Sequence, residues 1–439
     1  MSASLRHALV ASLGIVLVVL PAGCQRDQQP RQAGTPDSRA ASTDTLAADV
    51  MNAPSIARAI DRFRNEQSPA LADSAALRLR ADSLRHAGVS MQKEAPDRAR
   101  DSLHHALRAY RLLADSIGMA KSMRGIGGTY RYQSQYEAAM AQYDSSLALA
   151  RGLGNREEVA SALNYIGVVH RKQGRYEEAL SHYRDALTIR REIGDREAVA
   201  STLNNMGLVF WNQDKYDRAL SHYEKSLAIK RELGGRKGIA STLNNLGIIL
   251  WKQGKYDRAV GRYEEALALK REMGTREGVS RTLNNIGLVY KSQGQYEKAL
   301  TLYEESLAIK REIGYPEGTA RTLSNAGNVY RIQGEYVKAL SRYEKSLAIK
   351  QDIGDRDGAA RTLESIGDVH RDQGEYTEAL AHYEEALAIN RDIGNREGIA
   401  NSLSQIGTTR QRQGRHEQAL SAFRRSLRIE RAIDNRKDI

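Results

Sequence analysis

A 40-residue period constrains the fold of this chain more than any other feature of its sequence. From about residue 120 onward, the same pattern of side chains returns every 40 residues. A glycine marks each copy, at Gly127, Gly167, Gly207, Gly247, Gly287, Gly327, Gly367 and Gly407. Tyrosines and alanines recur with the same spacing, for example Tyr176 and Ala179. Because periods of about 20–50 residues are typical of proteins built from stacked supersecondary units, the sequence predicts a repeat architecture.

Each copy contains two segments with helical periodicity, separated by a turn. In one copy, Asn155 is suited to cap a first helix, with Glu158 completing a capping box. The apolar pattern then continues to the sequence KQGRY, in which Gly174 tolerates a left-handed turn. A second helical pattern follows and ends at Gly194. We therefore predict an all-α fold of tandem hairpins, each stabilised by its neighbours.

The small and aromatic positions of the repeat are similar to those of the tetratricopeptide repeat. The leucine-glycine, alanine and tyrosine marks of that family fall on Ile166-Gly167, Ala179 and Tyr183. The usual period of the family is about 34 residues. The 40-residue form here, with its LNNLG and QGxYxxA patterns, resembles the longer variety of kinesin light chains. The resemblance implies a right-handed superhelical α-solenoid whose first helices line a concave groove.

Composition and periodicity divide the chain into five segments. Residues 1–23 have the pattern of an export signal, and residues 24–54, which are polar and without hydrophobic period, are expected to form a flexible tether. Residues 55–118 are interpreted as a degenerate helical hairpin, and residues 119–434 as eight repeats. Residues 435–439 form a stub that matches the start of a further repeat. We expect the last repeat to cap itself through polar side chains; the alternative is that it ends against a partner.

The N-terminus resembles that of a bacterial lipoprotein. Residues 8–20 are an apolar run, shorter than a membrane-spanning helix and suited to a signal peptide. Cys24, the only cysteine, follows the small Ala22-Gly23 pair, although Pro21 stands where that family has leucine. The resemblance implies lipidation of Cys24 and anchoring to a membrane of the cell envelope, facing the periplasm or in the outer membrane. An ordinary cleaved signal, giving a secreted or periplasmic protein, and an uncleaved anchor are the alternatives.

A helical wheel of the first helix separates the side chains that face the core from those that face the groove. In the stretch from Ser241 to Lys252, Asn245 lies on the open side, and Asn244 flanks it toward the neighbouring repeat. Equivalent residues of the other copies form rows along the groove. These rows are Asn205, Asn245, Asn285 and Asn325; Leu208, Ile248 and Leu288; Arg281, Arg321 and Arg361; and the flanking pair Trp211 and Trp251.

The asparagine row suits an extended peptide, because each amide offers one acceptor and two donors that match the alternating groups of a backbone. Arg281 lies four residues before Asn285, and Arg321 four before Asn325. Each pair therefore shares one helix face, an arrangement suited to an acidic side chain or a carboxyl terminus. We predict that these rows bind a peptide. Two alternatives stay open: the flanking asparagines, such as Asn244, bridge neighbouring repeats, and the tryptophans pack rather than bind.

The sequence has few features that are typical of an enzyme. It has no P-loop, no H-E-x-x-H, no C-x-x-C and no nucleophile elbow, and its carboxylates recur with the repeat. We therefore expect no catalytic residue, metal, cofactor or small-molecule substrate. The net charge of +12 is compatible with an acidic partner, but the interleaved charges argue against nucleic acid. The predicted function is a scaffold for a protein or an extended peptide with acidic residues. The alternative is a sensor or regulatory module that acts with a separate signalling protein.

Overall fold

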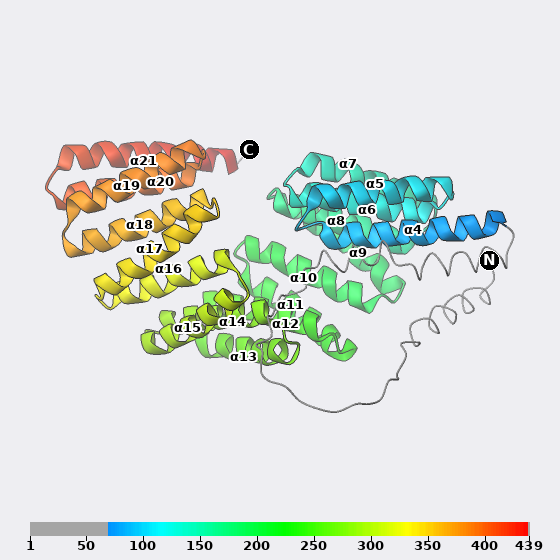
Figure 1. Cartoon of the computed structure of the whole chain (residues 1–439), viewed down its shortest axis with the longest axis horizontal. Coiled ribbons are helices and arrows are strands. Elements are labelled where there is room, and N and C mark those ends of the chain that lie inside the picture. The colour runs from blue at the N-terminus through cyan, green and yellow to red at the C-terminus, as the bar shows by residue number, and fades with distance from the viewer. Residues whose placement is uncertain (1–68, 438–439) are drawn as a thin grey trace, which may run out of the picture. The chain divides into compact units, whose positions relative to one another are not determined.

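The computed structural model describes residues 69–437, which form eighteen α-helices and no strand (Figure 1). The expected signal, the tether and Cys24 lie outside these residues. The first helices of the hairpins are α4 (Pro69–Met91), α6 (Ser116–Tyr132), α8 (Arg156–Lys172), α10 (Arg196–Asn212), α12 (Arg236–Lys252), α14 (Arg276–Ser292), α16 (Pro316–Ile332), α18 (Arg356–Gln373) and α20 (Arg396–Arg412). The second helices are α5 (Pro96–Leu112), α7 (Tyr136–Gly152), α9 (Tyr176–Glu192), α11 (Tyr216–Leu233), α13 (Tyr256–Glu272), α15 (Tyr296–Glu312), α17 (Tyr336–Asp352), α19 (Tyr376–Asp392) and α21 (His416–Lys437).

The helices begin and end through local hydrogen bonds. The Asn155 side chain accepts from the Glu158 amide at 3.0 Å, which confirms the predicted cap. The predicted capping box is wrong, because the Asn155 amide already donates to the Ala150 carbonyl of the preceding helix. The carboxylate of Glu158 instead pairs with Arg124, at 3.2 Å. At the hairpin turn, Gly174 has a φ of 79°, as its left-handed position predicts.

A tyrosine packed on a glycine forms the centre of each hairpin. Tyr183 of α9 is fully buried, and so are its equivalents in the other repeats from Tyr143 to Tyr383. A Cβ atom at position 167 would lie only 2.7 Å from Cε1 of Tyr183. The ring therefore packs directly on the backbone of α8, and a glycine is required there. The predicted close approach of the paired helices is confirmed.

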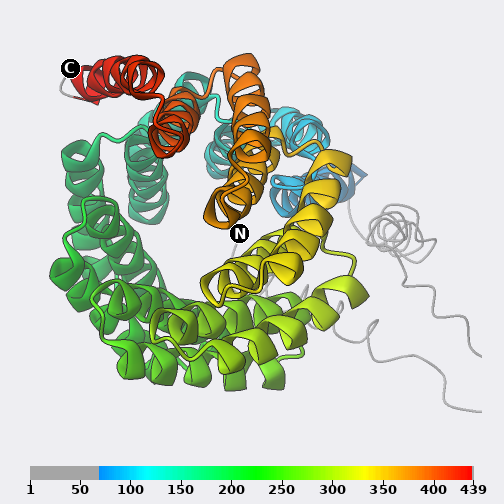
Figure 2. The same ribbon diagram turned by 90° about the vertical axis from the view of Figure 1, so that its left-hand side faces the viewer.

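The hairpins stack in chain order and follow a curved path, which Figure 2 shows for the described repeats. Each second helix packs on the first helix of its own hairpin and on that of the next. Neighbouring first helices also touch each other, α10 and α12 through Asn204 and Asn245, whereas neighbouring second helices lie farther apart. The first helices therefore lie on the inner side of the curve. Among the described residues, no helix is long and apolar enough to cross a membrane.

The last hairpin departs from the others at its end. In the preceding repeats, a glycine with positive φ, such as Gly394, follows the second helix. Asp434 stands at the equivalent position of the last repeat. Helix α21 continues through this position to Lys437 without a break.

Candidate functional site

The asparagines of the first helices form a hydrogen-bonded ladder from repeat to repeat. The groove asparagine of one repeat donates through Nδ2 to Oδ1 of the flanking asparagine in the preceding repeat. These bonds join Asn205 to Asn164 at 3.1 Å, Asn245 to Asn204 at 3.4 Å, Asn285 to Asn244 at 3.1 Å, and Asn325 to Asn284 at 3.0 Å. The flanking asparagines therefore bridge neighbouring repeats, which was one of the two alternatives.

These hydrogen bonds fix the groove asparagines but do not use all the donors and acceptors of their amides. Asn205, Asn245, Asn285 and Asn325 are all half-buried. Each donates one N–H to its neighbour, and its Oδ1 accepts no hydrogen bond within residues 69–437. One acceptor and one donor of each amide thus stay available for a ligand.

A column of lysines lies between the repeats beneath the asparagine ladder, and sequence reasoning missed it. Lys270 and Lys310 donate to the hydroxyls of Thr282 and Thr322, each at 2.6 Å. Thr322 in turn donates to Asn284 of the ladder at 3.0 Å. Lys310 is 0% exposed, and neither ammonium has a carboxylate partner in the part of the chain that the structure describes. Burial lowers the pKa of both lysines to about 8.

The predicted groove arginines are exposed on three successive first helices. Arg281 and Arg361 pair with carboxylates of their own helices, Glu277 at 3.5 Å and Asp357 at 2.7 Å. Arg321 has no ion pair with any described residue. Both Arg321 and Arg281 lie near enough to Lys310 to add to the lowering of its pKa by burial. The exposed side of these first helices is therefore rich in positive charge.

The predicted apolar rows lie at the edge of the core. Leu208, Ile248 and Leu288 are half-buried and pack against the core clusters of their repeats. Trp251 donates through Nε1 to the hydroxyl of Ser292 in the next repeat, at 2.9 Å. The ring of Trp211 lies 5.4 Å from that of Tyr216. Both indoles thus make contacts within the protein, in agreement with a packing role.

Arginines of a second row bind a carboxylate of the chain itself. We call Arg331, Arg371 and Tyr383, together with Asp368, the C-terminal cradle. The carboxylate of Asp368 in α18 forms ion pairs with two arginines, with Nη1 of Arg331 at 3.0 Å and with Nη2 of Arg371 at 2.8 Å. The hydroxyl of Tyr383 donates to the same carboxylate at 2.8 Å. Arg331 also pairs with Asp372, at 3.2 Å. The two arginines are therefore neutralised from within the fold, which helical-wheel reasoning did not anticipate.

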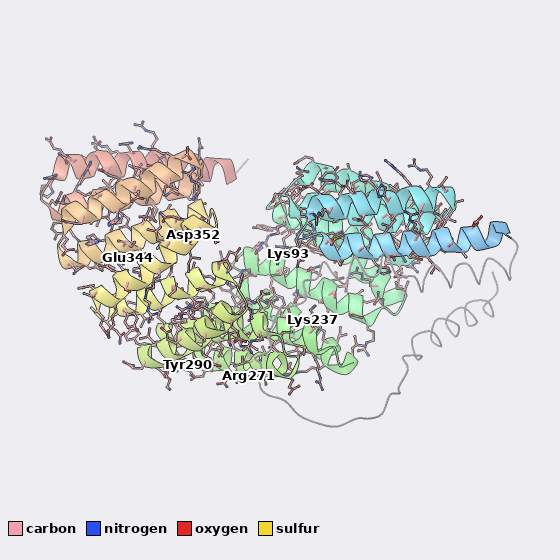
Figure 3. The ribbon with its side chains drawn as sticks, in the orientation of Figure 1. Lys93, Lys237, Arg271, Tyr290, Glu344 and Asp352 are labelled. Carbon is pink, nitrogen blue, oxygen red and sulfur yellow. The ribbon has the colours of Figure 1, made fainter. Side chains whose placement is uncertain are left out.

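Charged side chains outside the groove are spread over all repeats, as the exposed Lys237, Arg271 and Glu344 illustrate in Figure 3. Many of them join neighbouring repeats, for example Arg271 with Glu305 at 3.0 Å. Such exposed pairs contribute only about 0.2–1 kcal/mol each. Among the described residues, no group of three His, Cys, Asp or Glu side chains is placed to hold a metal ion.

Comparison with known proteins identifies the repeat. A family model described as a tetratricopeptide repeat matches residues 158–232, 199–272, 238–312, 278–352, 318–392 and 358–432. The chain belongs to the tetratricopeptide repeat family. The predicted fold class, a right-handed superhelical α-solenoid of stacked hairpins, is thereby confirmed. Among curated proteins, none matches the chain.

Several solved tetratricopeptide repeat structures have a similar fold. The quorum sensor NprR from B. thuringiensis, in its apo form, is 15% identical with a TM-score of 0.56, over 80% of this chain and 98% of that one. A Rap protein complexed with competence and sporulation factor is 14% identical with a TM-score of 0.53, over 82% and 99%. A signal transduction ATPase with a tetratricopeptide repeat sensor from Pyrococcus horikoshii is 16% identical with a TM-score of 0.56, over 79% and 55%.

Proposed function

We propose that this chain is a non-catalytic scaffold that holds an extended segment of a partner protein along its first helices. The observation that carries the proposal is the asparagine ladder. Each groove asparagine is fixed by one hydrogen bond to the preceding repeat, which leaves one donor and one acceptor of its amide for a backbone. Because a tethered amide loses little freedom on binding, such a row binds a peptide at a lower entropic cost than free side chains would.

The charge of the groove favours an acidic partner. The exposed Arg281, Arg321 and Arg361 lie on successive first helices, and the buried lysines beneath them add positive charge without any carboxylate partner. Hydrogen bonds between charged groups are about twice as strong as neutral ones, so acidic side chains of the segment gain most from this surface. The proposed location is the cell envelope, with the protein anchored through a lipidated Cys24; a secreted or periplasmic protein is the alternative.

Two double variants of the ladder test this function against a purely structural role. Asn245→Ala with Asn285→Ala removes two groove asparagines and two inter-repeat hydrogen bonds. Asn204→Ala with Asn244→Ala removes the same two hydrogen bonds but keeps the groove asparagines. Each double variant should lose about 1–3 kcal/mol of unfolding free energy, since one such bond contributes about 0.5–1.5 kcal/mol.

Peptide binding should separate the two variants. On an array of acidic peptides, we expect binding to be lost with Asn245→Ala and Asn285→Ala and largely kept with Asn204→Ala and Asn244→Ala. Circular dichroism would verify that both variants are folded. Equal loss of binding in both would show that the ladder acts by holding the repeats together. Unchanged binding in both would contradict the proposed function.

A further inference from the structure

The C-terminal cradle has a counterpart in the N-terminal half of the repeat array. Arg131 of α6, Arg171 of α8 and Tyr183 of α9 each lie 200 residues, or five repeats, before Arg331, Arg371 and Tyr383. We call Arg131, Arg171 and Tyr183 the N-terminal cradle. At the position of Asp368 this cradle has Val168, which is half-buried. The same three cradle side chains are thus present without the carboxylate of the chain.

No other repeat has this combination. A cradle requires an arginine near the end of two successive first helices and a core tyrosine behind them. The two arginines of a cradle occupy the same position in successive repeats. From the first repeat to the last, the residues at this position are Arg131, Arg171, Trp211, Trp251, Lys291, Arg331, Arg371 and Gln411. Successive arginines occur only as Arg131 with Arg171 and as Arg331 with Arg371, and only the second pair has an aspartate three residues before its second arginine.

Some polar atoms of the N-terminal cradle are buried without a hydrogen-bond partner, although Arg131 and Arg171 themselves are half-buried. The Tyr183 side chain is 0% exposed, and its hydroxyl has no hydrogen-bond partner, whereas the hydroxyl of Tyr383 donates to Asp368. Neither Arg131 nor Arg171 forms an ion pair with any residue between 69 and 437, whereas Arg331 and Arg371 both pair with Asp368. Nε is buried and unbonded in Arg131 and Arg171, as it is in Arg371, so the difference between the cradles lies in the ion pairs and the tyrosine hydroxyl. Because buried polar groups are nearly always hydrogen-bonded, the arrangement points to an acceptor from outside the chain.

The charges around the N-terminal cradle also favour an anion. Lys172 stands at the position equivalent to Asp372, so both carboxylates of the C-terminal cradle are replaced, one by valine and one by lysine. Burial raises the pKa of the Tyr183 hydroxyl to about 12, while the charge and close approach of Arg171 and the charge of Arg131 act in the opposite direction, although the hydroxyl and Arg171 do not have hydrogen-bond geometry. Both guanidinium groups therefore lie near the hydroxyl. The guanidinium of Arg131 stacks on the ring of Tyr132 at 4.2 Å and also lies near the hydroxyl of Tyr143.

We propose that Arg131 and Arg171 bind a carboxylate of the partner segment beside Val168, as Arg331 and Arg371 bind that of Asp368. The inference rests on the proposed function and assigns the acidic anchor of the segment to α6 and α8. The chain itself supplies the template for the ligand. A single carboxylate accepts from two guanidinium groups in the C-terminal cradle, and the N-terminal cradle presents the same donors on the inner side of the curve.

The test places the missing carboxylate into the chain. Val168→Asp copies Asp368 and should occupy the N-terminal cradle. Val168→Asn is the matched neutral control, because Asn328, at the equivalent position of another repeat, accepts from the hydroxyl of Tyr343 at 2.8 Å. Binding is measured by fluorescence anisotropy with labelled peptides that carry one glutamate, glutamine or phosphoserine in a serine-glycine background. The peptides are amidated, and one further glutamine peptide keeps its free carboxyl terminus.

The wild type and Val168→Asn should prefer the glutamate peptide over the amidated glutamine peptide by about tenfold, a typical effect for charged hydrogen bonds. Val168→Asp should lose this preference. A preference for the free carboxyl terminus that Val168→Asp also abolishes would identify a terminal carboxylate as the ligand. A phosphoserine preference that exceeds the glutamate preference and is lost with Val168→Asp would overturn the assignment to a carboxylate.

The reciprocal change opens the C-terminal cradle. Asp368→Val with Asp372→Lys gives it the residues found at positions 168 and 172. Isothermal titration with the glutamate peptide should then show one additional binding site, provided that circular dichroism verifies the fold.

The outcomes separate this inference from the proposed function. If Val168→Asp and Val168→Asn keep the same glutamate preference, the inference is wrong, while continued binding of the glutamine peptide leaves the proposed function standing. If the wild type binds none of the peptides, the proposed function and the inference both fail.

Discussion

A buried ammonium group without a carboxylate partner is costly, and the interfaces between repeats hold several. Lys310 is fully buried and donates to the hydroxyl of Thr322 at 2.6 Å. Burial disfavours the charged form, so the folded protein holds this proton less tightly than the unfolded chain does. The pKa of Lys310 is lowered from 10.5 to about 8 in the folded state. Below pH 8 both states carry the proton, and the full cost is present.

The sign of the pH dependence follows from this difference. Between pH 8 and 10.5 the unfolded chain binds more protons than the folded one, so the contribution of Lys310 to stability rises with pH. Lys310→Met removes the charge, and we expect this variant to be more stable than the wild type at pH 7, with an advantage that shrinks by about 2 kcal/mol toward pH 10. Urea unfolding of both proteins at several pH values measures this. The exposed Lys345→Met should show no such trend, and a constant difference for Lys310→Met would contradict the prediction.

Residue directions within one helix could be predicted from the sequence, but contacts between helices could not. The wheel directs Asn244 toward a neighbouring repeat, where it accepts from Asn285, yet it does not reveal that Asn245 also reaches Asn204 of the preceding repeat, at 3.4 Å. That contact depends on the distance and angle between neighbouring first helices. Lys310 illustrates the same limit, because the sequence AIKRE looks like an exposed helix end and only the stacking of the next hairpin buries it.

At the scale of the helix pair, the glycine of each first helix determines how closely the two helices approach. A Cβ atom at Gly247 of α12 would lie 2.6 Å from Cε1 of Tyr263 in α13. Alanine ordinarily stabilises a helix relative to glycine, by about 1 kcal/mol. Here the clash with a buried ring dominates, since overpacking costs about 1–3 kcal/mol and the ring has no space to move.

Gly247→Ala should therefore lower the free energy of unfolding, by about 1–3 kcal/mol. Gly261→Ala in α13 is the matched control, because a Cβ atom there meets nothing within 4 Å. That variant should gain up to about 1 kcal/mol. Chemical denaturation of the two variants decides between clash and helix propensity. Stabilisation by both would mean that the helices can separate without loss.

The hairpins were predictable because their marks are local and repeated. Glycine at the turn, an N-cap such as Asn155 and the Gly167–Tyr183 contact each depend on one hairpin alone. The capping box at Glu158 was mispredicted because the incoming helix α7 already uses the Asn155 amide and the preceding repeat supplies Arg124. The tertiary environment at the joint between two repeats decided both contacts.

At the scale of the whole molecule, the repeats are similar in fold but different in charge. The C-terminal cradle is neutralised by Asp368, whereas the N-terminal cradle keeps two unpaired arginines. A segment bound along the first helices would therefore meet unpaired arginines on α6 and α8, in addition to the exposed Arg281, Arg321 and Arg361 on later first helices. The 40-residue period alone does not contain this information, because it lies in the few positions where the copies differ.

The proposed lipid anchor at Cys24 affects the whole molecule, because it would determine where in the cell the repeats bind their partner. Cys24, outside the described residues, is the only cysteine, so fatty-acid labelling of a cysteine can report on no other position. In cells fed an alkyne-tagged palmitate, we expect the wild type to be labelled and to sediment with membranes, and Cys24→Ser to be unlabelled. Ser42→Ala in the expected tether should behave as the wild type. A wild type that carries no label would exclude lipidation, and its presence in the soluble periplasmic fraction would favour an ordinary cleaved signal. Lipidation would hold the repeats near the membrane at the length of the tether, because two or more acyl chains anchor a protein stably.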